Sequence, residues 1–121
     1  MNYSFFGTCA NDYEQLFGCL ETIIEQSIQP TQIILVNSGK KEIKDLILKN
    51  LNNKEIKLVY IRKNLSRVKA LNTAIDFLNT NYAFRFDTRT RFSECYAYNS
   101  LKTFNDKCIK ADVVGGVPEI I

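Results

Sequence analysis

The sequence contains no histidine, and its five glycines form neither of the familiar nucleotide-binding loops. Without an imidazole, Ser-His-Asp and Cys-His nucleophile pairs and histidine-ligated catalytic zinc are excluded. The segment Gly39-Lys40-Lys41 lacks the upstream glycine and the following hydroxyl of a phosphate loop, and no G-x-G-x-x-G follows the first expected strand. Any catalysis must therefore use carboxylates, lysine or a hard metal ion, and a nucleotide must be held in another way.

Cysteine pairs and long apolar runs are also missing. The four cysteines form no C-x-x-C pair and mostly lie within apolar patterns; they are Cys9, Cys19, Cys95 and Cys108. This favours buried, reduced thiols in a cytoplasmic protein over a disulfide framework or a zinc site. No charged N-terminal region leads into an apolar core, and no apolar run approaches the length of a membrane span, so we predict neither a signal peptide nor a transmembrane helix.

Length and charge indicate an ordinary globular protein. The 121 residues predict a single domain, residues 1–121, which can bury one core. The formal net charge of +3 is mildly basic and falls short of the basic stripe of a nucleic-acid-binding protein. It indicates a solvated surface with some preference for anionic ligands.

Apolar runs and helical periodicities alternate along the chain. Strands are expected at residues 3–9, 32–36, 56–61, 82–86 and 113–117. The first helix is expected to start at Asn11 with an approximate capping box to Glu14, and others at residues 41–51 and 93–107. A further helix carries an apolar side formed by Val68, Leu71, Ile75 and Leu78. Repeated strand-helix-strand units predict a Rossmann-like, three-layer α/β/α domain with a mainly parallel sheet.

Polar residues stand where the expected strands end. Asp87 directly follows the apolar run at residues 82–86, and in a parallel sheet that position opens onto the ligand crevice. The first strand ends in Thr8-Cys9-Ala10-Asn11, and the second ends at Asn37. These positions are therefore the candidate ligand-binding residues.

Five segments, in order and at matching intervals, resemble the nucleotide-sugar-binding half of family 2 glycosyltransferases. They are Gly7-Thr8-Cys9-Ala10-Asn11-Asp12, Gln32-Ile33-Ile34-Leu35-Val36-Asn37-Ser38-Gly39, the "A-L-N-x-A-I" segment at residues 65–75, the "D-x-D" region at residues 85–91, and the "V-G-G" strand at residues 112–116. Two positions depart from the family's pattern. Asn37 replaces the first aspartate of the second strand's motif, and Arg89 replaces the second metal-site carboxylate.

The resemblance implies a GT-A fold that binds a nucleoside diphosphate sugar, expected to be UDP-linked. The binding residues that it implies are Thr8, Cys9, Asn11, Asn37, Arg67, Asp87 and Arg89. Asp87 is expected to hold Mg²⁺ or Mn²⁺, because Mg²⁺ commonly takes one or two carboxylates and completes its shell with substrate phosphates and water. The "D-x-R" form could also place Arg89 or Arg91 on the diphosphate, a role that suits the arginine fork.

Each candidate also has a purely structural explanation. Thr8 could serve only local turn bonding, and Asn37 could form a turn with Ser38-Gly39. Arg67 could be a solvated arginine of a basic loop. Asp87 could form an ion pair; the partners that the sequence suggests are Arg85, Arg89 and Arg91.

The activity implied by the resemblance is inverting transfer of the sugar to a glycan or lipid-linked acceptor of a bacterial surface polysaccharide or glycolipid. The expected location is the cytoplasm, where other parts of the protein or its partners could hold it at the inner face of the membrane. In inverting members the carboxylate base lies well beyond the Gly-Gly strand, and the chain ends before that motif; Glu119 matches nothing in it. Because general-base assistance is worth roughly 100-fold to 10,000-fold, the 121 residues alone are expected to be inactive or weakly active.

Three other function classes remain open at this point. A non-catalytic nucleotide-sugar-binding or regulatory module would have the same fold without the base. A phosphoacceptor switch domain would use Asp12 and Asp87, but the last strand lacks a matching lysine. A nucleic-acid-binding domain would use the basic residues between 62 and 69, but no aromatic residue interleaves them.

Overall fold

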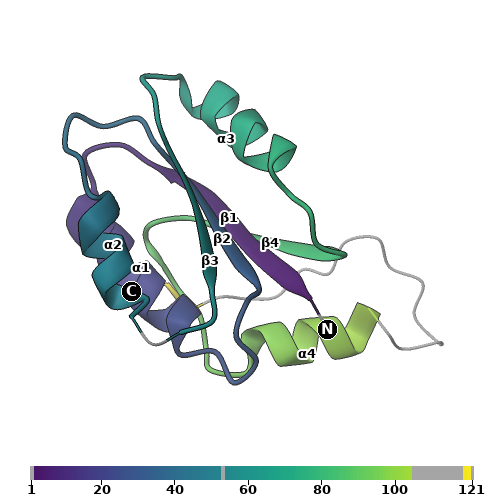
Figure 1. Ribbon diagram of the computed structural model, residues 1–121. Helices are drawn as coiled ribbons and strands as arrows, with labels where there is room; N and C mark the ends of the chain where they lie inside the picture. Colours follow the sequence, from purple (N-terminus) through teal and green to yellow (C-terminus); the bar gives the residue numbers. More distant parts are fainter. Residues whose placement is uncertain (1, 53, 105–118, 121) are drawn as a thin grey trace.

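The computed structural model describes residues 2–52, 54–104 and 119–120, and in it strands and helices alternate as predicted (Figure 1). The elements are β1 (Tyr3–Cys9), α1 (Tyr13–Ile24), β2 (Gln32–Asn37), α2 (Lys44–Asn50), β3 (Lys57–Arg62), α3 (Arg67–Asp76), β4 (Tyr82–Phe86), β5 (Thr90–Arg91), α4 (Tyr96–Phe104) and β6 (Glu119–Ile120). The strand predicted at residues 113–117 lies outside the described residues. No helix in the described part of the chain is long and apolar enough to cross a membrane.

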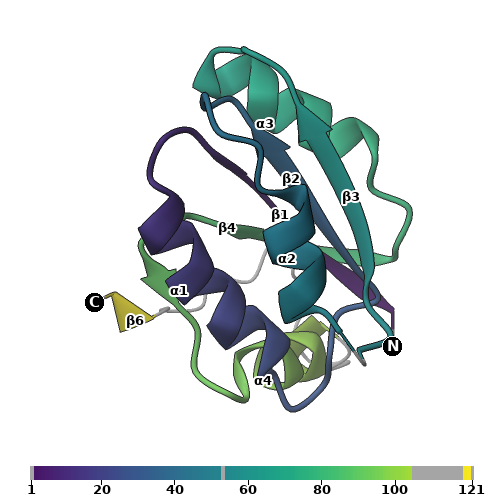
Figure 2. The same ribbon diagram turned by 60° about the vertical axis from the view of Figure 1, so that its left-hand side comes forward.

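The main sheet has four parallel strands in the order β3-β2-β1-β4. Helices α1, α2 and α4 cover one face of this sheet, and α3 covers the other (Figure 2). β5 and β6 form a separate antiparallel pair beside α1. The predicted three-layer α/β/α fold with a mainly parallel sheet is therefore confirmed.

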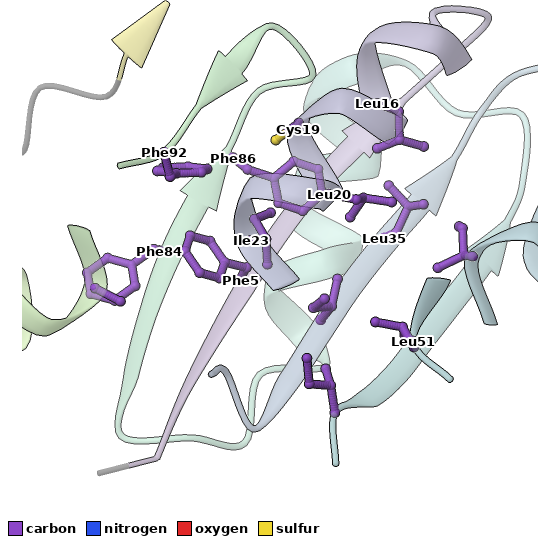
Figure 3. Close-up of a cluster of buried hydrophobic side chains, with 14 of the residues drawn as sticks. Phe5, Leu16, Cys19, Leu20, Ile23, Leu35, Leu51, Phe84, Phe86 and Phe92 are labelled. Atoms are coloured by element: carbon purple, nitrogen blue, oxygen red, sulfur yellow. The ribbon is translucent and has the colours of Figure 1, made fainter. Parts of the chain in front are cut away.

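The larger core lies on the face covered by three helices. Leucine and isoleucine side chains of α1 pack there against aromatic rings from β1 and β4 (Figure 3). The rings of Phe5 and Phe92 have centroids 5.0 Å apart, and Phe92 in turn lies 4.8 Å from Tyr96. These rings connect the central strand to α4 and to the segment that follows Asp87.

The other face is covered by α3 alone, and the apolar side predicted for this helix is only partly correct, because of its four residues Leu78 packs against the core of this face. The helix buries Ala70 and Ala74 against Ile34 and Val36, while Val68 is 69% exposed. The side chain of Ile75 is also exposed. Alanine lets the helix backbone approach the sheet closely, so small residues here take the inner positions that the periodicity assigned to larger ones.

Two smaller predictions about helices are also corrected. The N-cap of α1 is Asp12, which makes no side-chain capping bond, and the side chain of Asn11 accepts a hydrogen bond from the N–H of Lys40 instead. The predicted capping box is therefore absent. In α2, Leu46 shares the helical spacing of Ile43, Ile47 and Leu51, which predicts a buried side chain, but it is 46% exposed because the short helix contacts the core through the other three residues.

Candidate functional site

The topology predicts where a ligand can bind. The chain runs from β1 outward through β2 to β3 and then returns to place β4 on the opposite side of β1. The helices α1 and α2, which connect β1, β2 and β3, lie on one face, and α3, which connects β3 to β4, lies on the other, so a crevice opens at the carboxyl ends of β1 and β4. A cavity of about 510 Å³ lies at this point; its lining residues are Thr8, Cys9, Ala10, Asn11, Asp12, Ser38, Leu65, Arg67, Leu71, Arg85, Phe86, Asp87, Thr88 and Arg89.

The cavity brings together most of the residues that the sequence singled out. Those that line it are Thr8, Cys9, Asn11, Arg67, Asp87 and Arg89. They come from the end of β1, the start of α3 and the loop after β4, and they are separated by up to about 80 residues in the chain. Their gathering supports the assignment of this edge of the sheet as the site, although their contact with a ligand remains a prediction.

Asn37 is not among the cavity residues. Its side chain is fully buried, and its amide donates to the carbonyl of Lys41 at 2.8 Å and to the hydroxyl of Tyr60 at 2.9 Å. Its oxygen accepts from the N–H of Gly39 at 2.9 Å and from the hydroxyl of Tyr13 at 3.2 Å. Because every donor and acceptor of the amide is already paired, this position corresponds to the turn interpretation and does not support base recognition.

Asp87 and Arg67 contact each other across the cavity. Arg67 Nη2 lies 3.0 Å from Asp87 Oδ2, and Asp87 Oδ1 accepts from the backbone N–H of Arg89 at 3.1 Å. The ion pair that the sequence offered as an alternative therefore exists, but its cation comes from α3 and not from Arg85, Arg89 or Arg91. Two expected ligand-binding residues are thus partners of one another.

Asp12 is a second cavity carboxylate that the family resemblance did not mark as a binding residue. Its Oδ2 accepts from the hydroxyl of Thr88, and its Oδ1 accepts from the N–H of Ala10 at 2.9 Å. Burial raises the pKa of the Asp12 carboxyl, but these hydrogen bonds outweigh it and hold the pKa below its ordinary value. The carboxylate is therefore ionised at neutral pH. The signal in the sequence was its place in the short segment after the first strand, much as Asp87 follows the fourth.

The other arginines near the site have different roles. Arg85 and Arg89 line the cavity, whereas Arg91 does not. Arg91 donates to the carbonyls of Thr88 at 2.8 Å and Thr90 at 3.0 Å, so it braces the loop after β4. The suggestion that Arg91 contacts a diphosphate is therefore not supported by its position.

The cavity residues suit a metal ion only when the ligand helps to hold it. Within residues 2–52, 54–104 and 119–120, no three acidic, cysteine or histidine side chains group closely enough to bind a metal. Asp87 is exposed enough to take an ion, and carboxylate oxygen is what Mg²⁺ and Mn²⁺ prefer. This donor set fits an ion shared with substrate phosphates, with Asp87 as its protein ligand.

Cys9 lines the cavity, but its thiol is not a nucleophile. Burial, with a smaller contribution from the Asp12 charge, raises the pKa of Cys9 to about 12, and burial likewise raises that of Cys19 to about 12. At pH 8 only about 1 in 10,000 of such thiols is ionised. We expect iodoacetamide to modify the exposed Cys95 while Cys9 and Cys19 remain unmodified in peptide mass spectra. All three should react in urea, and rapid native labelling of Cys9 would contradict its burial.

Known proteins resemble this chain in sequence and in fold. The family model described as Glycosyl transferase family 2 matches residues 4–90. Among solved structures, S. aureus TarS 1-349 in complex with UDP has a TM-score of 0.72 at 13% identity, over 87% of this chain and 32% of that one. The mannosyltransferase PcManGT from Pyrobaculum calidifontis, in complex with GDP-Man and Mn²⁺, has a TM-score of 0.72 at 17% identity, over 88% and 33%.

The chain spans about a third of the length of these two structures. At such low identity the likeness shows the fold alone, and that fold is of the GT-A type, as the sequence predicted. No curated protein matches the chain.

Proposed function

The chain belongs to glycosyl transferase family 2, and from this premise we propose that its cavity binds the nucleoside diphosphate part of a sugar donor, preferably a UDP sugar. One observation carries the proposal. Three arginines and two aspartates meet at the switch point of the sheet; they are Arg67, Arg85, Arg89, Asp12 and Asp87. Guanidinium groups bind phosphate oxygens through paired hydrogen bonds, and carboxylates can share a cation with the same phosphates.

The reaction proposed is displacement at the anomeric carbon of the sugar by an acceptor hydroxyl, with inversion. In this step the diphosphate departs and gains negative charge, so preorganised positive groups lower the barrier. In this proposal Arg67 and Arg89, which line the cavity, supply those positive groups. A divalent ion held by Asp87 would supply further neutralisation of the same charge.

The proposal extends to the acceptor and the location. We infer that the acceptor is a glycan or lipid-linked molecule in the synthesis of a bacterial surface polysaccharide or glycolipid. We infer that the protein acts on it from the cytoplasm. In this proposal no cavity residue is assigned the role of the base that deprotonates the acceptor hydroxyl. The part of the reaction assigned to the cavity is therefore donor binding and stabilisation of the leaving group.

Isothermal titration calorimetry with UDP tests the donor site. We expect UDP to bind more tightly with Mn²⁺ than with EDTA, and Arg67→Gln to weaken binding about tenfold, which is what loss of a charge-assisted hydrogen bond causes. Lys69→Gln is the matched control, because Lys69 is an exposed cation of the same helix that does not line the cavity. Absence of UDP binding in both conditions, or equal losses in the two variants, would refute the donor-site assignment.

A further inference from the structure

The contact between Arg67 and Asp87 joins two parts of the cavity wall. Arg67 is the first residue of α3, and Asp87 follows β4 on the other side of the crevice. Their side chains are 69% and 46% exposed, so water and ligands reach both. No other ion pair occurs among the residues that the structure describes. Because both side chains are exposed, the pair contributes little to stability, and we therefore consider a role for it in ligand binding.

Each member of the pair occupies the group that a ligand would need. A phosphate oxygen and the Asp87 carboxylate are both anions that seek the guanidinium of Arg67, so they compete for it. A divalent cation and Arg67 likewise compete for Asp87, whose Oδ2 accepts from Arg67 Nη2 at 3.0 Å. A ligand that takes Arg67 Nη2 or Asp87 Oδ2 breaks the ion pair, and the first such ligand to bind releases the partner needed by the second.

Asp12 provides an internal contrast. Its two oxygens are bonded by neutral donors, the hydroxyl of Thr88 and the N–H of Ala10, and no arginine forms an ion pair with it in the described residues. Asp12 thus adds negative charge to the cavity without an ion pair to a cation, although the nearby charge of Arg89 helps to lower its pKa. If an acid masks Arg67, substitution of Asp87 should therefore reveal it and substitution of Asp12 should not.

We propose that Asp87 masks Arg67 when the cavity is empty, so that the site selects a diphosphate accompanied by a divalent cation over either one alone. This inference rests on the proposed function, because it describes how the same cavity discriminates between forms of its ligand. Asp87 has two opposite effects on anion affinity. It lowers the affinity for a free diphosphate by holding Arg67, and it raises the affinity for a cation-bound one by holding the cation.

The masking effect is small and measurable. Exposed ion pairs contribute little, which corresponds to a change of roughly twofold to fivefold in a binding constant. With EDTA present, we expect Asp87→Asn to bind inorganic pyrophosphate two to five times more tightly than the unchanged chain. With Mn²⁺ present, we expect the order to reverse. Asparagine keeps the size of the side chain and loses its charge, and because the side chain is exposed the melting temperature should barely change.

A double-mutant cycle separates masking from simple charge repulsion. Removing any acid near an anion site raises anion affinity to some extent, whether or not Arg67 is present. If Asp87 acts through Arg67, the gain from Asp87→Asn should disappear in an Arg67→Gln background. Asp12→Asn measures repulsion alone and should give a similar, small effect in both backgrounds.

The possible outcomes distinguish the inference from the proposed function. An equal gain from Asp87→Asn with and without Arg67, or weaker pyrophosphate binding by Asp87→Asn in EDTA, overturns the inference. Pyrophosphate binding with the expected cycle, but no preference for UDP over pyrophosphate, supports the inference and removes the nucleotide-sugar assignment. Absence of pyrophosphate binding by all four proteins of the Asp87–Arg67 cycle overturns both.

Discussion

Replacing Gly39 with alanine is expected to lower the free energy of unfolding by about 2–3 kcal/mol, as overpacking of a close contact does. A Cβ atom at this position would lie 1.9 Å from the carbonyl oxygen of Ala10 and 2.1 Å from the hydroxyl of Tyr13. The carbonyl belongs to the backbone of the loop after β1 and cannot swing away. Because Ala10 and Asn11 line the cavity, the same change should weaken UDP binding. Urea unfolding and calorimetry measure the two effects.

Gly18→Ala is the control for Gly39→Ala. The added Cβ atom would again be too close to a neighbour, at 2.3 Å from Arg91 Nη2, but that atom is the end of a flexible side chain. Alanine also favours the helix interior by about 1 kcal/mol relative to glycine. We expect a net change within about 1 kcal/mol. A loss as large as that of Gly39→Ala would mean that glycine is needed for a reason other than backbone contact.

Phe5→Ala is expected to cost about 3–5 kcal/mol, the usual loss for deleting a buried ring. Phe5 is fully buried in the central strand, and its ring lies 5.0 Å from Phe92 and 5.7 Å from Phe84. Total stabilities of small domains are about 5–15 kcal/mol, so this single change could remove much of the folded population. Loss of cooperative urea unfolding, or a midpoint shift of matching size, would be the observed result.

Phe77→Ala is the matched aromatic control for Phe5. Phe77 is 48% exposed at the end of α3, so its ring buries less apolar surface than the ring of Phe5. We expect a loss below about 1 kcal/mol, in line with ordinary surface substitutions. If the two substitutions were equally destabilising, the ring cluster would not be the main source of stability on that face of the sheet.

The sequence predicted the strands well because each is a short apolar run, but it predicted only part of the inner side of α3 correctly. Periodicity identified the helix and not which side of it faces the sheet, since Val68 and Ile75 satisfy the same spacing rule as Ala70 and Ala74. The choice depends on how closely the helix approaches the sheet, which the neighbouring strands determine. Local pattern alone contains no such distance.

The candidate site was predictable in its position and less so in its contacts. Strand-end polar residues indicated the correct edge of the sheet, because all parallel strands present their carboxyl ends there. The partners of Asn37 and Asp87 were not predictable, since Tyr60 and Arg67 are distant in the sequence and reach them only through the fold. Resemblance to a family assigns roles to positions, and it does not reveal which of those side chains bind one another.

The two faces of the sheet are covered by different numbers of helices, and this difference affects how easily each layer opens. Three helices hold one face of the sheet, whereas α3 holds the other with two fully buried alanines. Segments with little buried apolar area open locally at a lower free energy than the global transition, so amide hydrogen exchange should be fastest in α3 among the longer helices. Because α3 begins at Arg67, we expect each opening to separate that arginine from Asp87, which lies outside the helix. Anion binding is thereby coupled to the order of one helix.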